Sequence, residues 1–133
     1  MGWLVEYKDL DDQQKNFVDN VDIDQQNIWI KGFPGCGKSI LLAYLFKRII
    51  NKNPKPHVVV VVFTHSLIAM YEAAFQEMDL KAKIQTYFRF RNSCEKYDYI
   101  LCDEVQDLTP SILDEMNQRA KHVIVTGDEN QSI

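Results

Sequence analysis

Apolar and polar positions follow one another along the chain with spacings that predict strands and helices in turn. Residues 58–63, Val-Val-Val-Val-Val-Phe, form a continuous apolar run, which is typical of a strand buried on both faces of a sheet. Residues 67–78 instead carry apolar side chains at the spacing of a helix. Over the whole chain, the predicted strands are 27–31, 58–63, 83–86, 97–102 and 122–126, and the predicted helices are 11–21, 40–50, 67–78 and 109–119.

This alternation of strands with helices predicts the fold class. Strand–helix–strand units form parallel sheets whose helices cover both faces. We therefore expect an α/β fold with a mostly parallel sheet of about five strands and helices on both faces. The chain has 133 residues, which is enough for one domain and too few for two.

Composition and charge exclude several classes of protein. The chain is 46% apolar and 26% charged, which is ordinary globular usage and excludes a disordered chain, a collagen-like repeat and a coiled coil. Its 15 basic and 19 acidic residues give a net charge of −4, so the surface is not coated for nonspecific binding of nucleic acid. Any contact with DNA must therefore be local.

The cysteines and the apolar runs indicate the cellular compartment. The three cysteines are Cys36, Cys94 and Cys102, an odd number with no C-x-x-C pair, which predicts reduced thiols. The longest apolar run is 58–63, far short of the roughly 20 residues of a membrane helix. The start of the chain also lacks the pattern of a signal peptide. We expect a soluble, cytoplasmic chain with no membrane partner.

A glycine-rich segment between a predicted strand and a predicted helix indicates a phosphate-binding loop. Residues 32–39, Gly-Phe-Pro-Gly-Cys-Gly-Lys-Ser, fit the pattern G-x-x-x-x-G-K-[ST]. Backbone N–H groups of such a loop and the positive end of the following helix bind phosphate, Lys38 would reach the β- and γ-phosphates, and Ser39 would hold Mg²⁺. The alternative is an ordinary glycine-rich turn that caps a helix. The candidate ATP-binding residues here are Gly32, Pro34, Gly35, Cys36, Gly37, Lys38, Ser39 and Ile40.

Carboxylates follow the predicted strand 97–102. Asp103 comes 64 positions after Ser39, and a carboxylate at the carboxyl end of a parallel strand points into the crevice where ligands bind. Asp103 is therefore a candidate Mg²⁺ ligand together with Ser39, either directly or through water. Glu104 would orient and deprotonate the attacking water, and Gln131 would sense the γ-phosphate by hydrogen bonding. Lys38, Glu104 and Gln131 are thus the candidate catalytic residues, although an acidic cluster alone is usually a solvated face.

These segments, at 32–39, 103–107 and 127–133, resemble in their order and sequence the superfamily 1 helicases of the UvrD/Rep type, which are RecA-like P-loop NTPases. The D-E-x-Q-D and G-D-x-x-Q-S-I forms carry the resemblance. It implies a motor that uses ATP and Mg²⁺ and couples ATP hydrolysis to translocation along single-stranded DNA. It also implies that Gln14 reads the adenine, since Leu-Asp-Asp-Gln-Gln at 10–14 is similar to the family's L-N-x-x-Q. The alternative for Gln14 is a polar helix start.

Two further segments are similar to the family's contacts with single-stranded DNA. The first contains Thr64 and His65, directly after the predicted strand 58–63, and the second contains Tyr87 and Phe88. Aromatic side chains can stack on bases, and arginines nearby can pair with phosphates. The same aromatic residues would equally suit the core or an interface, so both interpretations stay open.

The resemblance has two departures. Only a few dozen residues separate Thr64 from Asp103, where the family usually inserts an accessory domain, and the chain ends at Ile133 within the third motif. The second motor domain, which supplies arginines to the γ-phosphate, would follow that point. We therefore expect residues 1–133 to be a single N-terminal ATP-binding domain, truncated after the third motif, that binds ATP but hydrolyses it weakly. The alternatives are a P-loop ATPase that does not unwind and a nucleotide-binding module that acts through a partner.

Overall fold

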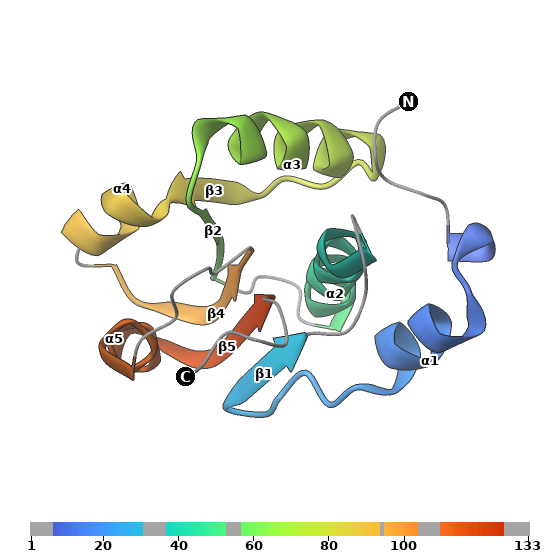
Figure 1. Cartoon of the computed structure of the whole chain (residues 1–133), viewed down its shortest axis with the longest axis horizontal. Coiled ribbons are helices and arrows are strands. Elements are labelled where there is room, and N and C mark those ends of the chain that lie inside the picture. Colours follow the sequence, from blue (N-terminus) through green and yellow to red (C-terminus); the bar gives the residue numbers. More distant parts are fainter. Residues whose placement is uncertain (1–6, 31–36, 53–56, 94, 104–109, 127–133) are drawn as a thin grey trace.

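The computed structural model of the chain describes residues 7–30, 37–52, 57–93, 95–103 and 110–126 (Figure 1). A short 3-10 turn, Tyr7–Asp9, precedes the first helix. The strands are β1 (Asn27–Ile30), β2 (Val58–Val62), β3 (Lys83–Thr86), β4 (Tyr97–Cys102) and β5 (Ala120–Thr126). The helices are α1 (Asp12–Asn20), α2 (Gly37–Lys52), α3 (His65–Glu77), α4 (Tyr87–Asn92) and α5 (Pro110–Arg119).

The strands form one parallel sheet in the order β1-β5-β4-β2-β3, so the predicted α/β fold is confirmed. The connections after the neighbouring strands β2 and β4 run through α3 and α5, which pack on opposite faces. In an open α/β sheet such a divergence opens a ligand crevice at the carboxyl ends of the strands. The fold therefore points to that edge as the place for a site.

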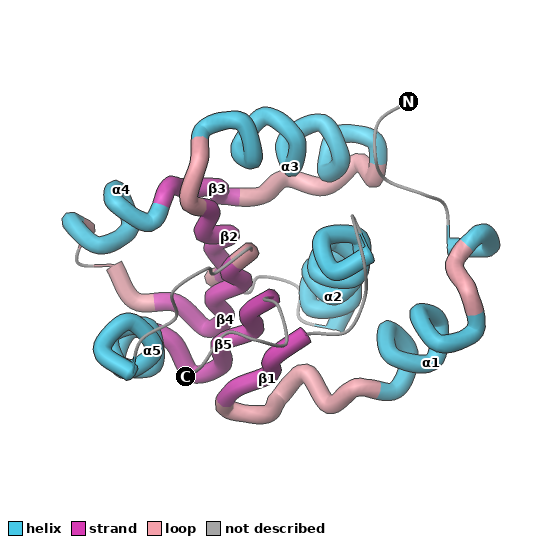
Figure 2. Tube along the Cα trace, viewed as in Figure 1, coloured by secondary structure: helices cyan, strands magenta, loops and turns pink. Residues whose placement is uncertain are grey.

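Two apolar layers flank the sheet and explain why β2 is apolar at every position. Val58, Val60 and Val62 join the core beneath α1, α2 and α3. Val59 and Val61 join the core beneath α4 and α5. Side chains alternate between the faces of a strand, so a central strand with helices on both sides is apolar throughout. Figures 1 and 2 show α1 and α2 on one side of the strands and α5 on the other.

Several element boundaries differ from the predicted ones. Helix α2 begins at Gly37, three residues before the predicted start, because Gly37, Lys38 and Ser39 carry no apolar pattern yet form its first turn. Helix α4 was not predicted; Thr86 caps it by accepting a hydrogen bond from the Arg89 N–H at 3.2 Å. Within the described residues, no helix is long and apolar enough to cross a membrane.

Candidate nucleotide and metal site

The site lies at the carboxyl edge of the sheet, where β4, β5 and the first turn of α2 meet. Among the described residues, the buried polar or charged side chains other than tyrosine and cysteine are Ser39, Asp103 and Thr126. All three belong to this one cluster. Burial of polar groups is unfavourable unless they bond to one another, and here they do.

Asp103 is the centre of the cluster. It is fully buried directly after β4, and its backbone N–H donates to the carbonyl oxygen of Val61 at 3.0 Å. The Ser39 hydroxyl donates to Asp103 Oδ2 at 2.8 Å, and the Thr126 hydroxyl donates to Oδ1 at 2.6 Å. The Tyr71 hydroxyl, from α3, donates to Oδ2 at 2.5 Å. Three hydroxyl groups from three elements thus compensate the burial of this carboxylate.

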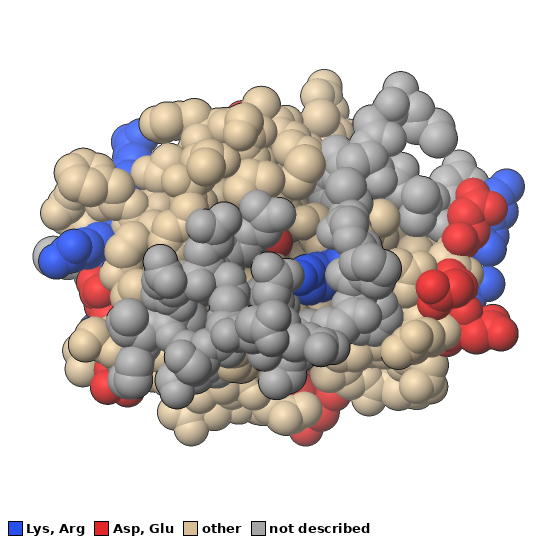
Figure 3. Space-filling model, in the orientation of Figure 1, with Lys and Arg blue, Asp and Glu red and all other residues tan. Residues whose placement is uncertain are grey.

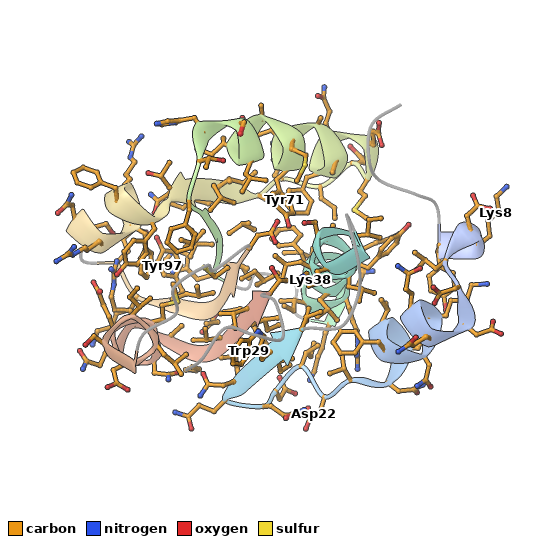
Figure 4. All side chains as sticks on the ribbon, viewed as in Figure 1. Lys8, Asp22, Trp29, Lys38, Tyr71 and Tyr97 are labelled. Carbon is orange, nitrogen blue, oxygen red and sulfur yellow. The ribbon has the colours of Figure 1, made fainter. Side chains whose placement is uncertain are left out.

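The amino end of α2 supplies the other half of the site. Gly37 and Ser39 are buried there and Lys38 is half-buried, and Figure 4 shows Lys38 near the centre of the molecule. A helix amino end carries unpaired N–H groups and a positive partial charge, which together favour a bound phosphate. The side chain of Ile40 packs into the core, so only its backbone is suited to face a ligand.

The remaining predicted loop residues Gly32, Pro34, Gly35 and Cys36 lie outside the described residues. The candidate catalytic residues Glu104 and Gln131 also lie outside them. Their predicted roles therefore stay predictions.

The donors present suit a magnesium ion. Ser39 offers a hydroxyl oxygen and Asp103 carboxylate oxygens, and Mg²⁺ prefers oxygen ligands. In the described part of the chain, no group of three or more His, Cys, Asp or Glu side chains could hold a metal by itself. Mg²⁺ usually takes one or two protein ligands and completes its shell with water and substrate phosphates, and the hydrogen-bonded pair of Ser39 and Asp103 offers such ligands.

Cys102 precedes Asp103 and is a core residue. It is fully buried beneath α4 and α5, and burial raises the pKa of its thiol well above the ordinary value, with the nearby Asp103 adding to the effect. A thiol with a raised pKa stays protonated and is a poor nucleophile. The position of Cys102 is therefore that of a packing residue at this edge of the sheet.

Gln14 lies in the first turn of α1, where it forms a capping box with Asp11. The Asp11 carboxylate accepts from the Gln14 N–H at 2.7 Å, and the Gln14 side-chain oxygen accepts from the Asp11 N–H at 3.1 Å. This reciprocal pair stabilises the start of the helix. Gln14 therefore has the helix-capping position that the sequence analysis gave as the alternative to an adenine contact. The contact of Gln14 with adenine stays a prediction.

The candidate nucleic-acid residues lie at the ends of β2 and β3, which are neighbours in the sheet. Thr64 caps α3 and His65 begins it, and both are exposed. Phe88 is 76% exposed, more than any other large apolar side chain in the described part of the chain. These three therefore have side chains that another molecule can reach.

Tyr87 is held within the protein. Its ring stacks on Phe63 with centroids 5.3 Å apart, and its hydroxyl donates to Glu115 Oε2 at 3.1 Å. Burial, followed by the bond to Glu115, raises the pKa of Tyr87. Of the two predicted aromatic residues, Phe88 is thus the one presented to solvent, and Phe63, which the sequence did not single out, lies beside Tyr87.

Two residues of the buried cluster were not predicted. Thr126 ends β5 at the same edge as Asp103, so its position at a strand end was a usable signal. Tyr71 lies in the middle of α3 and has no such local signal, because only the packing of α3 against the sheet brings its hydroxyl to Asp103.

The chain is similar to one protein family and to individual known proteins. The model of the family described as viral superfamily 1 RNA helicase core domain matches residues 28–133. A curated relative, F-box DNA helicase protein 1 of Schizosaccharomyces pombe, is 39% identical over 72 residues, which cover 51% of this chain and 8% of that relative's length. Domain III of the replication initiation protein DnaA of Thermotoga maritima has a TM-score of 0.49 at 18% identity, covering 86% of this chain and 48% of that one.

Proposed function

The chain belongs to the viral superfamily 1 RNA helicase core domain family, and from this premise we propose that it is the nucleotide-binding motor domain of a UvrD/Rep-like superfamily 1 helicase. In the whole protein it would couple ATP hydrolysis to translocation along single-stranded DNA, together with a second motor domain. The single observation that supports this most is the 2.8 Å hydrogen bond from Ser39 to Asp103. It joins the last residue of the phosphate-loop motif to the first carboxylate of the acidic motif, across 64 positions of sequence.

Each residue of the site has a proposed role. Lys38 contacts the β- and γ-phosphates and balances their charge, while the first turn of α2 contributes its N–H groups. Ser39 and Asp103 hold Mg²⁺, which when bound neutralises negative charge on the phosphates. Glu104 orients the attacking water and accepts its proton, and Gln131 hydrogen-bonds the γ-phosphate. Gln14 hydrogen-bonds the adenine edge.

Hydrolysis by the chain alone is expected to be slow. An arginine supplied from outside the site contributes about 10³–10⁵ in rate in related phosphoryl-transfer systems. In the proposed motor such an arginine comes from the second motor domain. We therefore expect the chain to bind ATP and to turn it over far below the rate of a complete motor.

The proposed path of the nucleic acid runs over the ends of β2 and β3. Thr64 and His65 are exposed there, and Phe88 offers a ring on which a base can stack. Arg89 and Arg91 on α4 are exposed and provide positive charge for phosphates. Figure 3 shows basic side chains gathered at the left end of its view, where α4 lies in Figure 1.

The experiment that tests nucleotide binding is a calorimetric titration of Mg·ATP into the chain. We expect saturable binding that is lost in Lys38→Ala. Lys47→Ala is the matched control, because Lys47 is an exposed lysine of the same helix, about 13 Å further along it at 1.5 Å per residue. Equal binding by the wild type and Lys38→Ala, or no binding by either, would contradict the proposal.

A second candidate function is a P-loop ATPase that responds to nucleic acid without unwinding it. It is favoured by the short route from Thr64 to Asp103, in which the described residues form α3, β3, α4 and β4 of the one sheet fold. Two assays on the same sample distinguish the two functions: stimulation of ATP hydrolysis by single strands of DNA and of RNA, and strand separation. Both functions predict stimulation of hydrolysis, but only the helicase predicts strand separation. For both the helicase and the non-unwinding ATPase, Glu104→Gln should abolish ATP turnover and keep ATP binding. In a module that only binds nucleotide, the same substitution should have no measurable effect.

A further inference from the structure

Among the described residues that donate to Asp103, Tyr71 is the aromatic one, and it has no place in the motifs considered so far. It is fully buried in α3, and its hydroxyl donates to Asp103 Oδ2 at 2.5 Å. In Figure 4 its side chain extends from α3 toward the centre of the molecule, where Lys38 also lies in this view. We propose that Tyr71 is a positioning residue that orients the Asp103 carboxylate for Mg²⁺, an inference that rests on the proposed function.

The distribution of donors around Asp103 gives Tyr71 this role. An ionised carboxylate has about four lone-pair sites, two on each oxygen. The hydroxyls of Ser39 and Tyr71 both donate to Oδ2, while Thr126 donates to Oδ1. Counting the donors of the described residues, Oδ2 accepts two hydrogen bonds and Oδ1 accepts one, so Oδ1 keeps a lone-pair site for the metal or one of its water molecules. Tyr71 therefore fixes which oxygen is turned toward the ligand.

Tyr71 is suited to hold this orientation because its ring cannot rotate freely. The ring stacks on Phe75 of the same helix with centroids 5.7 Å apart, and Phe75 packs on Phe46 of α2 at 4.6 Å. A side chain locked by packing directs its hydroxyl without further loss of conformational freedom when a ligand binds. Groups that orient a metal-binding carboxylate typically contribute 10–100-fold to metal affinity or activity.

The ordinary alternative is that Tyr71 only satisfies its own buried hydroxyl. Buried tyrosine hydroxyls usually find some partner, so the hydrogen bond alone does not decide between the two roles. The chain offers a matched comparison in Tyr99, another buried tyrosine whose hydroxyl donates to a carboxylate, that of Asp24 at 2.8 Å. Its partner lies in the segment between α1 and β1, away from the cluster. A purely structural role predicts similar consequences for the two hydroxyls.

The test is calorimetric titration of ADP into the chain, with Mg²⁺ and with EDTA, for the wild type, Tyr71→Phe and Tyr99→Phe. The measured quantity is the factor by which Mg²⁺ strengthens ADP binding. We expect Tyr71→Phe to reduce this factor about tenfold while affinity in EDTA changes less than about twofold, since outer-sphere partners contribute at least that much. Tyr99→Phe should keep the wild-type factor.

A double variant tests whether Tyr71 acts through Asp103. Asp103→Asn should already lose most of the Mg²⁺ factor, so Tyr71→Phe added to it should change nothing further. Three results would overturn the proposal. The first is a double variant whose loss of the Mg²⁺ factor is the product of the two single losses. The others are a Tyr71→Phe chain that keeps the full Mg²⁺ factor, and a Tyr71→Phe chain that circular dichroism shows to be unfolded at 10 °C while Tyr99→Phe is folded. If the wild type binds ADP and Lys38→Ala does not, the proposed function stands even where the role of Tyr71 fails.

Discussion

Arg119 connects α5 to α4, and its replacement by lysine should destabilise the chain substantially. The guanidinium donates to the backbone oxygens of Phe90 at 2.7 Å and Glu95 at 3.1 Å, and to the Ser93 hydroxyl at 3.1 Å. Its Cζ lies 3.9 Å from the centroid of the Phe90 ring. The side chain is only 12% exposed, so these contacts are largely shielded from water.

The magnitude follows from what lysine cannot replace. A hydrogen bond from a charged group contributes about 1.5–3 kcal/mol, and a shielded cation–π contact about 2 kcal/mol. Lysine keeps the charge and can make one of the three hydrogen bonds, but it lacks the fork that reaches the others. Because such contributions are not additive, we expect Arg119→Lys to lower the free energy of unfolding by about 2–3 kcal/mol in total.

Urea unfolding followed by circular dichroism measures this change. Arg91→Lys is the control, because Arg91 is an exposed arginine on α4 and its replacement should change the free energy of unfolding by less than about 0.5 kcal/mol. For a chain of this size the Arg119 variant should also melt roughly 10 °C lower. A loss below about 0.5 kcal/mol, or one equal to that of Arg91→Lys, would refute the reasoning that Arg119 joins the two helices.

Three further predictions concern the core, the acid side of the stability profile and the buried thiol. Val60→Ala should reduce the free energy of unfolding by about 2 kcal/mol in urea titrations, because Val60 is fully buried at the centre of the sheet. Hydrogen bonds from Lys52 and then Tyr99 lower the pKa of Asp24, so its stabilising contribution is present at neutral pH and lost as the pH falls through that lowered value. Urea midpoints of the wild type and Asp24→Asn should therefore differ at pH 7 and converge toward pH 2. Cys102 should resist iodoacetamide at pH 8 in the folded chain and react once urea unfolds it, as peptide mass spectrometry would show.

The core strands were predictable because their patterns are local. Five consecutive valines in β2 can be accommodated only between two helical layers, and both layers are present. The bounds of β3 and β4 are as predicted. β4 is a run of mainly aromatic and apolar residues, whereas β3 has only Ile84 and Thr86 as β-favouring residues. The pairing of Ser39 with Asp103 was also accessible, because parallel strands and the helix after β1 bring their motifs to one edge of the sheet.

The missed features depend on tertiary packing. Helix α4 is only six residues long, and the sequence Tyr-Phe-Arg-Phe-Arg-Asn has no strong helical pattern. It forms because Thr86 caps it and because Phe90 is buried. The Phe90 side chain packs in the core on the α5 side of the sheet, and the Arg119 guanidinium lies over its ring. Tyr71 lies on the apolar face of a predicted helix, and nothing in the sequence distinguishes it from the other residues of that face. Which of them meets Asp103 is decided by the position of α3, which a single sequence does not reveal.

The arrangement around Asp103 gives a physical basis for coupling the two halves of the proposed function. Its carboxylate is bonded to α2, α3 and β5 at once, so a shift of any one of these elements changes the donors that the carboxylate meets. Helix α3 runs from its cap at Thr64 to Tyr71 over about 10 Å at 1.5 Å per residue. Under the proposed function, the cap end of α3 faces nucleic acid and Tyr71 faces the metal carboxylate. Under this proposal the same helix would contact both ligands, and thermodynamic linkage requires that any influence of one ligand on the affinity for the other act equally in both directions.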